Sequence, residues 1–283
     1  MGIGKNKVAF QGVHGAHADL ACRQAHPYMD TLPYASFEDV FDAVENGEAE
    51  YGMLPIENSQ AGRVAEIHQL LPHKKVHIIG EYFQPIEHHL LAPKGTKLED
   101  ITDIYSHPQA LMQCRQTIRE INKSIITHSY SNTAVAAEDV SKWDESSKAA
   151  IASELASNLY NLDVIKSNIE DSKTNTTVFV TISKEPVDPD PEEGPVITSL
   201  LFTARNIPAA LYKALGGFAT NHVNLLKIES YIPGGVSQTA QFFISLIGHP
   251  SDKNVQLAIE ELGFFCKNVK VLGIYHADKK RNL

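Results

Sequence analysis

The side chains best suited to chemistry lie in four polar clusters within the first two thirds of the chain. Each cluster follows an apolar run that predicts a strand. Together they supply amide, hydroxyl and imidazole groups: Asn58-Ser59, Ser106-His107-Pro108-Gln109, Asn132-Thr133 and Asn175-Thr176-Thr177. Three clusters also open a predicted helix, where unpaired backbone N–H groups carry a partial positive charge. Three such helix ends in one cleft would suit a small molecule with several carboxylates.

Each cluster also has a purely structural interpretation. Asn58 or Ser59 could cap the following helix, because short polar side chains accept hydrogen bonds from the first helical N–H groups. A lone histidine such as His107 is usually structural, and the segment around Thr177 could be an ordinary β-branched strand. Residue chemistry alone leaves both interpretations open.

The elements that would position these clusters form two α/β lobes. Apolar runs and amphipathic helical patterns alternate through residues 1–183, which predicts parallel strands joined by right-handed crossovers. The predicted strands are 8–10, 31–34, 51–55, 76–92 (one or two strands), 101–105, 124–129, 149–152 and 176–183, and the predicted helices are 18–25, 37–46, 63–71, 110–120, 133–140 and 154–160. We expect the chain to cross between the lobes near 80–85 and 163–171, with ligands beyond the carboxyl ends of the strands.

A proline-rich acidic segment, residues 184–195, predicts an extended linker, because proline lacks a backbone donor and like charges repel. The pattern after it is βαββαβ, which is typical of ferredoxin-like domains. Its predicted elements are strand 196–204, helix 209–219, strands 224–231 and 239–247, helix 252–264 and strand 269–276. Gly234-Gly235 fits a hairpin turn between the central strands.

Composition argues against several classes of protein. The net charge of −9 is spread along the chain and leaves no basic stripe, so we expect no nucleic-acid partner. Cys22, Cys114 and Cys266 are far apart and predict neither disulfides nor a zinc site, and the thirteen histidines lack metal-ligand spacing. There is no apolar run of about 18 residues and no signal-peptide pattern at the start, so we expect a cytoplasmic protein without a membrane span.

Taken in order, the clusters resemble the prephenate dehydratase family over nearly the whole chain. The resemblance rests on Pro55-Ile56-Glu57-Asn58-Ser59 with Gly62 and Val64, Ser106-His107-Pro108-Gln109-Ala110-Leu111 with Gln113-Cys114, Asn132-Thr133-Ala134 with Ala136-Ala137, Ala150-Ile151-Ala152 with Ala156 and Tyr160, and Asn175, Thr177 and Phe179. It implies an α/β two-lobed catalytic domain with a periplasmic-binding-protein-like cleft (1–183), a linker (184–195), and an α+β ferredoxin-like ACT regulatory domain (196–283).

The implied activity is the decarboxylating dehydration of prephenate to phenylpyruvate in phenylalanine biosynthesis, with no cofactor and no metal. Such a site must hold two carboxylates, orient the ring and assist departure of hydroxide. By resemblance Thr177 is the donor to the leaving hydroxyl. The implied substrate-binding residues are Asn58, Ser59, Ser106, His107, Gln109, Asn132, Thr133, Asn175 and Phe179.

The same resemblance implies that L-phenylalanine is an allosteric effector. The implied effector-binding residues are Asn206, Ala209, Ala210, Leu211, Asn221, Asn224, Glu229 and Ser230. The family's Gly-Ala-Leu-Val and Glu-Ser-Arg-Pro motifs correspond to 209–212 and 229–232, and both are changed here. A lone βαββαβ sheet exposes its edges and one face, so we expect a homo-oligomer, a dimer or tetramer, that pairs through residues 196–283.

Two departures touch the catalytic domain. The family's Gly-Thr-Tyr/Phe-Ser start corresponds to Gly15-Ala16-His17-Ala18, and its Thr-Arg-Phe motif corresponds to Thr177-Val178-Phe179, which lacks the guanidinium. Strand alternation predicts that Val178 faces away from Thr177 and Phe179. Two alternatives therefore stay open: an arogenate dehydratase, and a non-catalytic phenylalanine-sensing binding protein.

Overall fold

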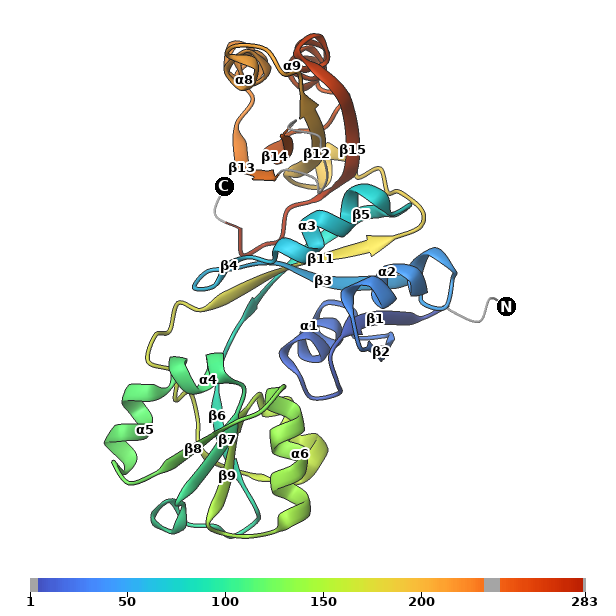
Figure 1. Cartoon of the computed structure of the whole chain (residues 1–283). Coiled ribbons are helices and arrows are strands. Elements are labelled where there is room, and N and C mark those ends of the chain that lie inside the picture. Colours follow the sequence, from blue (N-terminus) through green and yellow to red (C-terminus); the bar gives the residue numbers. More distant parts are fainter. Residues whose placement is uncertain (1–4, 232–239, 282–283) are drawn as a thin grey trace.

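The computed structural model describes residues 5–231 and 240–281, which form three stacked parts (Figure 1). The first lobe contains β1 (Lys7–Gln11), β2 (Asp30–Tyr34), β3 (Tyr51–Asn58), β4 (Gly62–Arg63), β5 (His77–Pro85), β11 (Thr176–Ser183), α1 (His17–Ala25), α2 (Phe37–Glu45), α3 (Ala65–Leu70) and a 3-10 turn, η1 (Leu71–His73). The strand β1 is parallel to β2 and β3, and β11 is antiparallel to β3 and β5. Val8, Ala9 and Phe10 are fully buried, because helices cover both faces of this sheet.

The second lobe is a separate five-stranded sheet in the order β10-β6-β9-β7-β8. Its elements are β6 (His89–Ala92), η2 (Leu98–Asp100), β7 (Asp103–Ser106), α4 (Pro108–Gln113), α5 (Arg115–Ile121), β8 (Ile126–Ser129), α6 (Thr133–Trp143), β9 (Lys148–Ala152), α7 (Glu154–Tyr160) and β10 (Asp163–Lys166). The chain enters this lobe between β5 and β6 and returns to the first lobe between β10 and β11.

The C-terminal part has the predicted βαββαβ order. After η3 (Pro191–Glu193) come β12 (Val196–Ala204), α8 (Ala210–Thr220), β13 (Leu225–Tyr231), β14 (Gln241–Ile247), α9 (Lys253–Phe265) and β15 (Cys266–His276). The strands form an antiparallel sheet in the order β13-β14-β12-β15. The fold-class prediction, two α/β lobes followed by a ferredoxin-like domain, is confirmed.

The C-terminal sheet is joined to the sheet of the first lobe, which the sequence did not predict. The strand β15 runs parallel to β5 where Gly273 meets Ile78, so the two sheets form one continuous ten-stranded sheet. A Cβ at Gly273 would lie 1.9 Å from the Ile78 carbonyl oxygen, so only glycine permits this approach. One hydrophobic core spans the junction and contains Val180 from the first lobe with Phe243 and Tyr275 from the C-terminal part.

Two further details differ from the sequence prediction. The predicted helix 110–120 is interrupted at Cys114, because the Asp171 carboxylate accepts hydrogen bonds from Gln116 N (2.9 Å) and Thr117 N (3.0 Å) and so starts a new helix. The predicted return segment 163–171 contains β10, which pairs antiparallel with β6. The hairpin turn predicted at Gly234-Gly235 lies outside the described residues.

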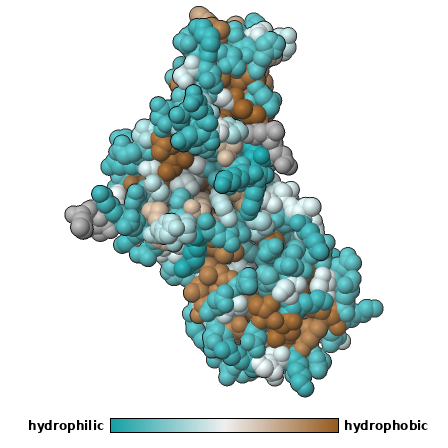
Figure 2. All heavy atoms as spheres, turned by 180° about the vertical axis from the view of Figure 1, so that it is seen from behind, coloured by the Kyte–Doolittle hydropathy of each residue, from teal (hydrophilic) through white to brown (hydrophobic). Residues whose placement is uncertain are grey.

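The surface is mixed in character. Brown hydrophobic residues reach the rear surface in all three parts of the molecule and are separated by teal hydrophilic ones (Figure 2). On the C-terminal part, Tyr212 of α8 is 81% exposed and Phe264 of α9 is 71% exposed. Across residues 5–231 and 240–281, no helix has both the length and the apolar character to cross a membrane.

Candidate active site

A cavity of about 470 Å³ lies between the two lobes. The first lobe contributes residues from the start of α1, from the β3–β4 hairpin and from β11. The second lobe contributes the first turns of α4 and α6, and the crossing segments contribute Ile86, His88 and Asn175. Three of the clusters follow strands β3, β7 and β8, as expected for side chains at the ends of strands. The fourth does not follow a strand, because Asn175 and Thr177 lie at the start of β11, which runs antiparallel to β3 and brings Thr177 opposite Asn58.

The centre of the cavity is a hydrogen-bonded group of three side chains. Asn58 Nδ2 donates to Asn175 Oδ1 (2.8 Å) and to Thr177 Oγ1 (2.9 Å), while Asn58 Oδ1 accepts from the backbone N–H groups of Gln60 (3.0 Å) and Ala61 (2.8 Å). These two backbone donors fix which end of the amide is oxygen. Thr177 Oγ1 therefore accepts from Asn58, and its own O–H has no acceptor among the described residues and can donate into the cavity.

The second lobe presents two helix starts to the cavity. His107 Nδ1 accepts from Gln109 N (3.2 Å), so Nε2 is the ring nitrogen that carries hydrogen. Asn132 Oδ1 accepts from Ala134 N (2.8 Å) and caps α6, whose first residue, Thr133, also lines the cavity. His107 and Asn132 thus cap helices and line the cavity at the same time. The capping considered for Asn58 or Ser59 is not found, because α3 begins after Val64 without a side-chain cap. Both helix starts offer donors that suit carboxylates.

A chain of side-chain hydrogen bonds closes one wall. His88 Nε2 lies 2.9 Å from Gln113 Oε1, and Gln113 Nε2 donates to Gln60 Oε1 at 3.0 Å. His17 lies beside His88 with ring centroids 5.3 Å apart. Burial lowers the pKa of His17 to about 3 and also lowers the pKa of His88. Both imidazoles are therefore neutral at pH 7, and they add polarity to this wall without adding charge.

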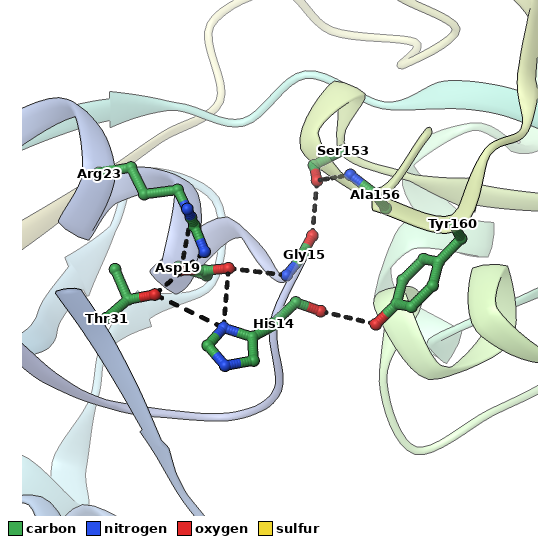
Figure 3. A network of polar contacts seen from close by, with 8 residues as sticks. All are labelled: His14, Gly15, Asp19, Arg23, Thr31, Ser153, Ala156 and Tyr160. Atoms are coloured by element: carbon green, nitrogen blue, oxygen red, sulfur yellow. Dashed lines mark hydrogen bonds and ion pairs between the residues drawn. The ribbon is translucent and has the colours of Figure 1, made fainter. Parts of the chain in front are cut away.

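The lobes also contact each other beside the cavity, through the segment that precedes α1 (Figure 3). Ser153 Oγ donates to the Gly15 carbonyl (2.6 Å), and Tyr160 OH donates to the His14 carbonyl (2.9 Å). On the other side, Gly15 N donates to the fully buried Asp19 carboxylate (2.9 Å). Residues 14–15 thus join α7 of the second lobe to α1 of the first, which fixes the position of the neighbouring His17.

Eight of the ten residues expected in the site line the cavity: Asn58, His107, Gln109, Asn132, Thr133, Asn175, Thr177 and Phe179. Ser59 and Ser106 lie elsewhere. Ser59 Oγ donates to the Thr174 carbonyl (3.0 Å) and accepts from Thr176 N (3.0 Å), which ties β3 to β11. Ser106 is fully buried and donates to the Ile151 carbonyl (2.6 Å).

Six lining residues carry polar or charged groups and were not among the expected site residues: Gln11, His17, Arg63, His88, Gln113 and Ser131. His17, Arg63, Gln113 and Ser131 stand inside or next to the segments that resemble family motifs, so position within a motif was the available signal. Gln11 and His88 gave no local signal. Among the described residues, no three His, Cys, Asp or Glu side chains gather as a metal site would require.

The predicted alternation along β11 is confirmed. Thr177 and Phe179 line the cavity between the lobes, whereas Thr176, Val178 and Val180 line a second cavity of about 490 Å³ between β11 and the C-terminal sheet. Val178 therefore lies away from the Thr177 hydroxyl.

The expected effector-binding residues fall at three places within one chain. Asn206, Ala209, Ala210 and Leu211 lie at or before the start of α8, Asn221 and Asn224 lie at or beyond its end, and Glu229 and Ser230 lie on β13. Asn221 Nδ2 donates to Glu261 Oε1 (2.9 Å), whereas Glu229 and Ser230 contact Arg63 of the first lobe.

Comparisons with known proteins agree on one family. The family model described as prephenate dehydratase matches residues 8–187. A bifunctional N-acyl-homoserine lactone acylase/prephenate dehydratase of Komagataeibacter europaeus is 43% identical over 278 residues, 98% of each chain. Arogenate dehydratase/prephenate dehydratase 1 of Arabidopsis thaliana is 36% identical over 291 residues, 98% of this chain and 74% of that protein.

Two solved structures match nearly the whole chain. The structure described as GqqA, a novel type of quorum quenching acylases, superposes with a TM-score of 0.90 at 44% identity, covering 98% of this chain and 100% of that one. The prephenate dehydratase of Arthrobacter aurescens in complex with L-Phe superposes with a TM-score of 0.87 at 28% identity, covering 98% and 92% of the two chains.

Proposed function

We propose, since the chain belongs to the prephenate dehydratase family, that it converts prephenate into phenylpyruvate, carbon dioxide and water. The observation that carries this proposal is the fixed orientation of the Asn58 amide. Because Asn58 donates to Thr177 Oγ1, the Thr177 O–H is left to donate to a leaving group in the cavity.

The reaction breaks two bonds and restores an aromatic ring. The bond between the ring and its carboxylate breaks to release carbon dioxide, and its electron pair moves through the ring to expel the hydroxyl on the opposite carbon. The hydroxyl leaves as water, with a proton that solvent ultimately supplies. Thr177 donates a hydrogen bond to the departing oxygen, and the Asn58 N–H stabilises the negative charge that grows on Thr177 Oγ1.

Binding is the second task of the cavity. Prephenate carries a ring carboxylate and a pyruvyl carboxylate, and the second lobe offers His107 Nε2–H, the Gln109 amide and the start of α6 at Thr133. Phe179, which is 3% exposed, offers an apolar wall for the ring. The chemistry needs positioning and hydrogen-bond donation, and it consumes no cofactor.

Purified protein should be incubated with prephenate and, separately, with arogenate, while the aromatic product is followed by absorbance. Arogenate differs by an amino group in place of the keto oxygen, and relatives carry both names. We expect faster turnover of prephenate. Turnover of arogenate alone would support the arogenate dehydratase alternative. Turnover of neither, together with binding of phenylalanine, would support the sensor.

A second candidate activity is hydrolysis of N-acyl-homoserine lactones. It is favoured by the 43% identity to a bifunctional acylase/prephenate dehydratase across 98% of both chains. Release of homoserine lactone, measured by chromatography, tests it. If both activities share the cavity, prephenate should inhibit the release competitively. Release that prephenate does not affect would place the second activity elsewhere on the chain.

We further propose that residues 196–283 form an ACT regulatory domain, that it binds L-phenylalanine, and that it pairs in a homodimer or tetramer. The Arthrobacter aurescens relative in complex with L-Phe supports the ligand. The outer position of β13 and the exposed Tyr212 and Phe264 support pairing. Light scattering that reports a monomer at micromolar concentration, or calorimetry without heat at millimolar phenylalanine, would contradict these proposals.

The catalytic domain is proposed to be residues 1–183, with 184–195 as the linker, and the location is proposed to be cytoplasmic. Cys22, Cys114 and Cys266 are free and buried, which supports a reducing compartment.

A further inference from the structure

Arg63 brings a positive charge to the cavity between the lobes. Arg63 is the only lysine or arginine among the described residues that line this cavity. It stands on β4, which pairs with β3 so that Arg63 lies opposite Glu57 and Gly62 lies opposite Asn58. The turn that Asn58 fixes through Gln60 and Ala61 therefore also fixes the point where the arginine leaves the hairpin.

One end of the Arg63 guanidinium is held by the C-terminal part. Arg63 Nη1 donates to the Ser230 carbonyl (2.8 Å) and lies 3.3 Å from Glu229 Oε2, both on β13. The guanidinium has five N–H donors, so Nη2 and Nε keep donors for another partner. The Arg63 side chain is 40% exposed, and Arg63 lines the cavity between the lobes.

Glu229, which holds Arg63, is itself held by a second ion pair. Glu229 Oε1 lies 3.8 Å from Lys227 Nζ, which pairs with Glu57 Oε2 at 2.5 Å. The side chains of Lys227 and Glu229 are 17% and 24% exposed, so both are partly shielded from solvent. The β3–β4 hairpin and β13 are thus joined by a row of alternating charges, formed by Arg63, Glu229, Lys227 and Glu57. This row limits the positions open to the Glu229 side chain.

We propose that Arg63 binds a carboxylate of the substrate, and that Glu229 and Ser230 serve the cavity by holding Arg63 in position. This inference rests on the proposed function for the identity of the substrate. It gives a catalytic-cleft role to two residues that the resemblance assigned to effector binding. It also gives this cavity a guanidinium, which suits a carboxylate through charge-assisted hydrogen bonds.

The test compares Arg63→Gln and Arg63→Lys with Arg119→Gln, a matched control on the exposed face of α5. For Arg63→Gln we expect KM for prephenate to rise about tenfold to a hundredfold while kcat changes little. Lysine keeps the charge without the planar fork, so it should recover part of the affinity. The control should match the wild type. Calorimetry with phenylpyruvate, a carboxylate that does not turn over, measures binding without chemistry.

A double-mutant cycle tests the positioning role of Glu229. Glu229→Gln should raise KM in the wild-type background, but should change KM less than about twofold in the Arg63→Gln background. Equal effects in both backgrounds would overturn the positioning role. Melting temperatures of all variants show whether each remains folded.

The outcomes separate this inference from the proposed function. Turnover of prephenate with an unchanged KM in Arg63→Gln would overturn the role of Arg63 alone. Binding of phenylpyruvate without turnover of prephenate, with binding weakened in Arg63→Gln, would overturn the proposed function and uphold Arg63. Absence of both binding and turnover in the wild type would overturn both.

Discussion

Replacing Thr177 by valine removes the proposed donor and keeps the shape of the side chain. A hydrogen bond to the leaving hydroxyl acts only as that bond breaks, so its loss should lower kcat and leave KM nearly unchanged. Donation to a leaving group typically contributes a factor of about 10² to 10⁴, and we expect a fall in kcat within that range. Thr177→Ser keeps the hydroxyl and is the matched control. It should retain activity within about tenfold of the wild type.

The structure also sets the expected cost in stability. Thr177 is 8% exposed, and valine leaves one Asn58 N–H without its acceptor while the bond to Asn175 remains. An unsatisfied buried donor costs about 1–3 kcal/mol, which corresponds to a melting temperature lower by roughly 2–12 °C. Turnover should be followed by phenylpyruvate absorbance well below the melting temperature of the variant. A folded Thr177→Val enzyme with a kcat near the wild-type value would refute the role of this hydroxyl.

Three further predictions concern His68, Val178 and Gly273. His68 is 3% exposed, and burial, reinforced by neighbouring cations, lowers its pKa to about 4. Its contribution to the stability of the fold is therefore present above pH 6.5 and is lost as the pH falls toward 4. Urea unfolding at pH 7.5, 6 and 5 gives the free energy of unfolding at each pH. The change of this free energy with pH should be smaller by about 1.4 kcal/mol per pH unit in His68→Leu than in the wild type, and an equal pH dependence would contradict this. Val178→Arg should leave KM for prephenate within about twofold of the wild type, because alternation along the strand turns residue 178 away from the substrate; a tenfold lower KM would show that the new guanidinium reaches the substrate. Gly273→Ala should lower the melting temperature by several degrees, since a Cβ would meet the Ile78 carbonyl, and an unchanged melting temperature would contradict the close approach of β15 to β5.

Sequence patterns predicted most strands correctly, because burial determines which positions of a strand are apolar. The first strand, β1, reads as a short apolar run because helices cover both of its faces, and the alternation in β11 separated Val178 from Thr177 correctly. The rule that polar residues following a strand gather at one edge of the sheet identified Asn58 and Asn132 as cavity residues. These features depend on neighbours within a few positions along the chain, so they can be predicted from the sequence.

The features that escaped prediction depend on distant partners. Arg63 looked like an ordinary helix-start residue, because nothing near it shows that Ser230, 167 positions away, will accept its hydrogen bond. The break at Cys114 depends on Asp171, whose carboxylate accepts a hydrogen bond from Gln116 N, 55 positions away. The sheet junction depends on Gly273, and in a sequence a glycine inside a strand indicates only that some backbone comes close.

The strand β11 offers a physical basis for coupling the two cavities. Thr177 faces the cavity between the lobes, and the adjacent Val178 faces the cavity beside the C-terminal sheet, so the two sites are opposite sides of one strand. Its neighbour β5 is hydrogen-bonded to β11 along most of its length and touches β15 at Ile78. A shift of β15 would therefore move β5 directly and β11 through the ladder, whereas a shift of β13 would act on Arg63 through Glu229. The two routes end on different groups. The first alters Thr177, the proposed donor to the leaving hydroxyl, and should change kcat, and the second alters Arg63, the proposed carboxylate contact, and should change KM. An effector of the C-terminal domain that changes KM alone would thus act through β13 rather than through the sheet junction.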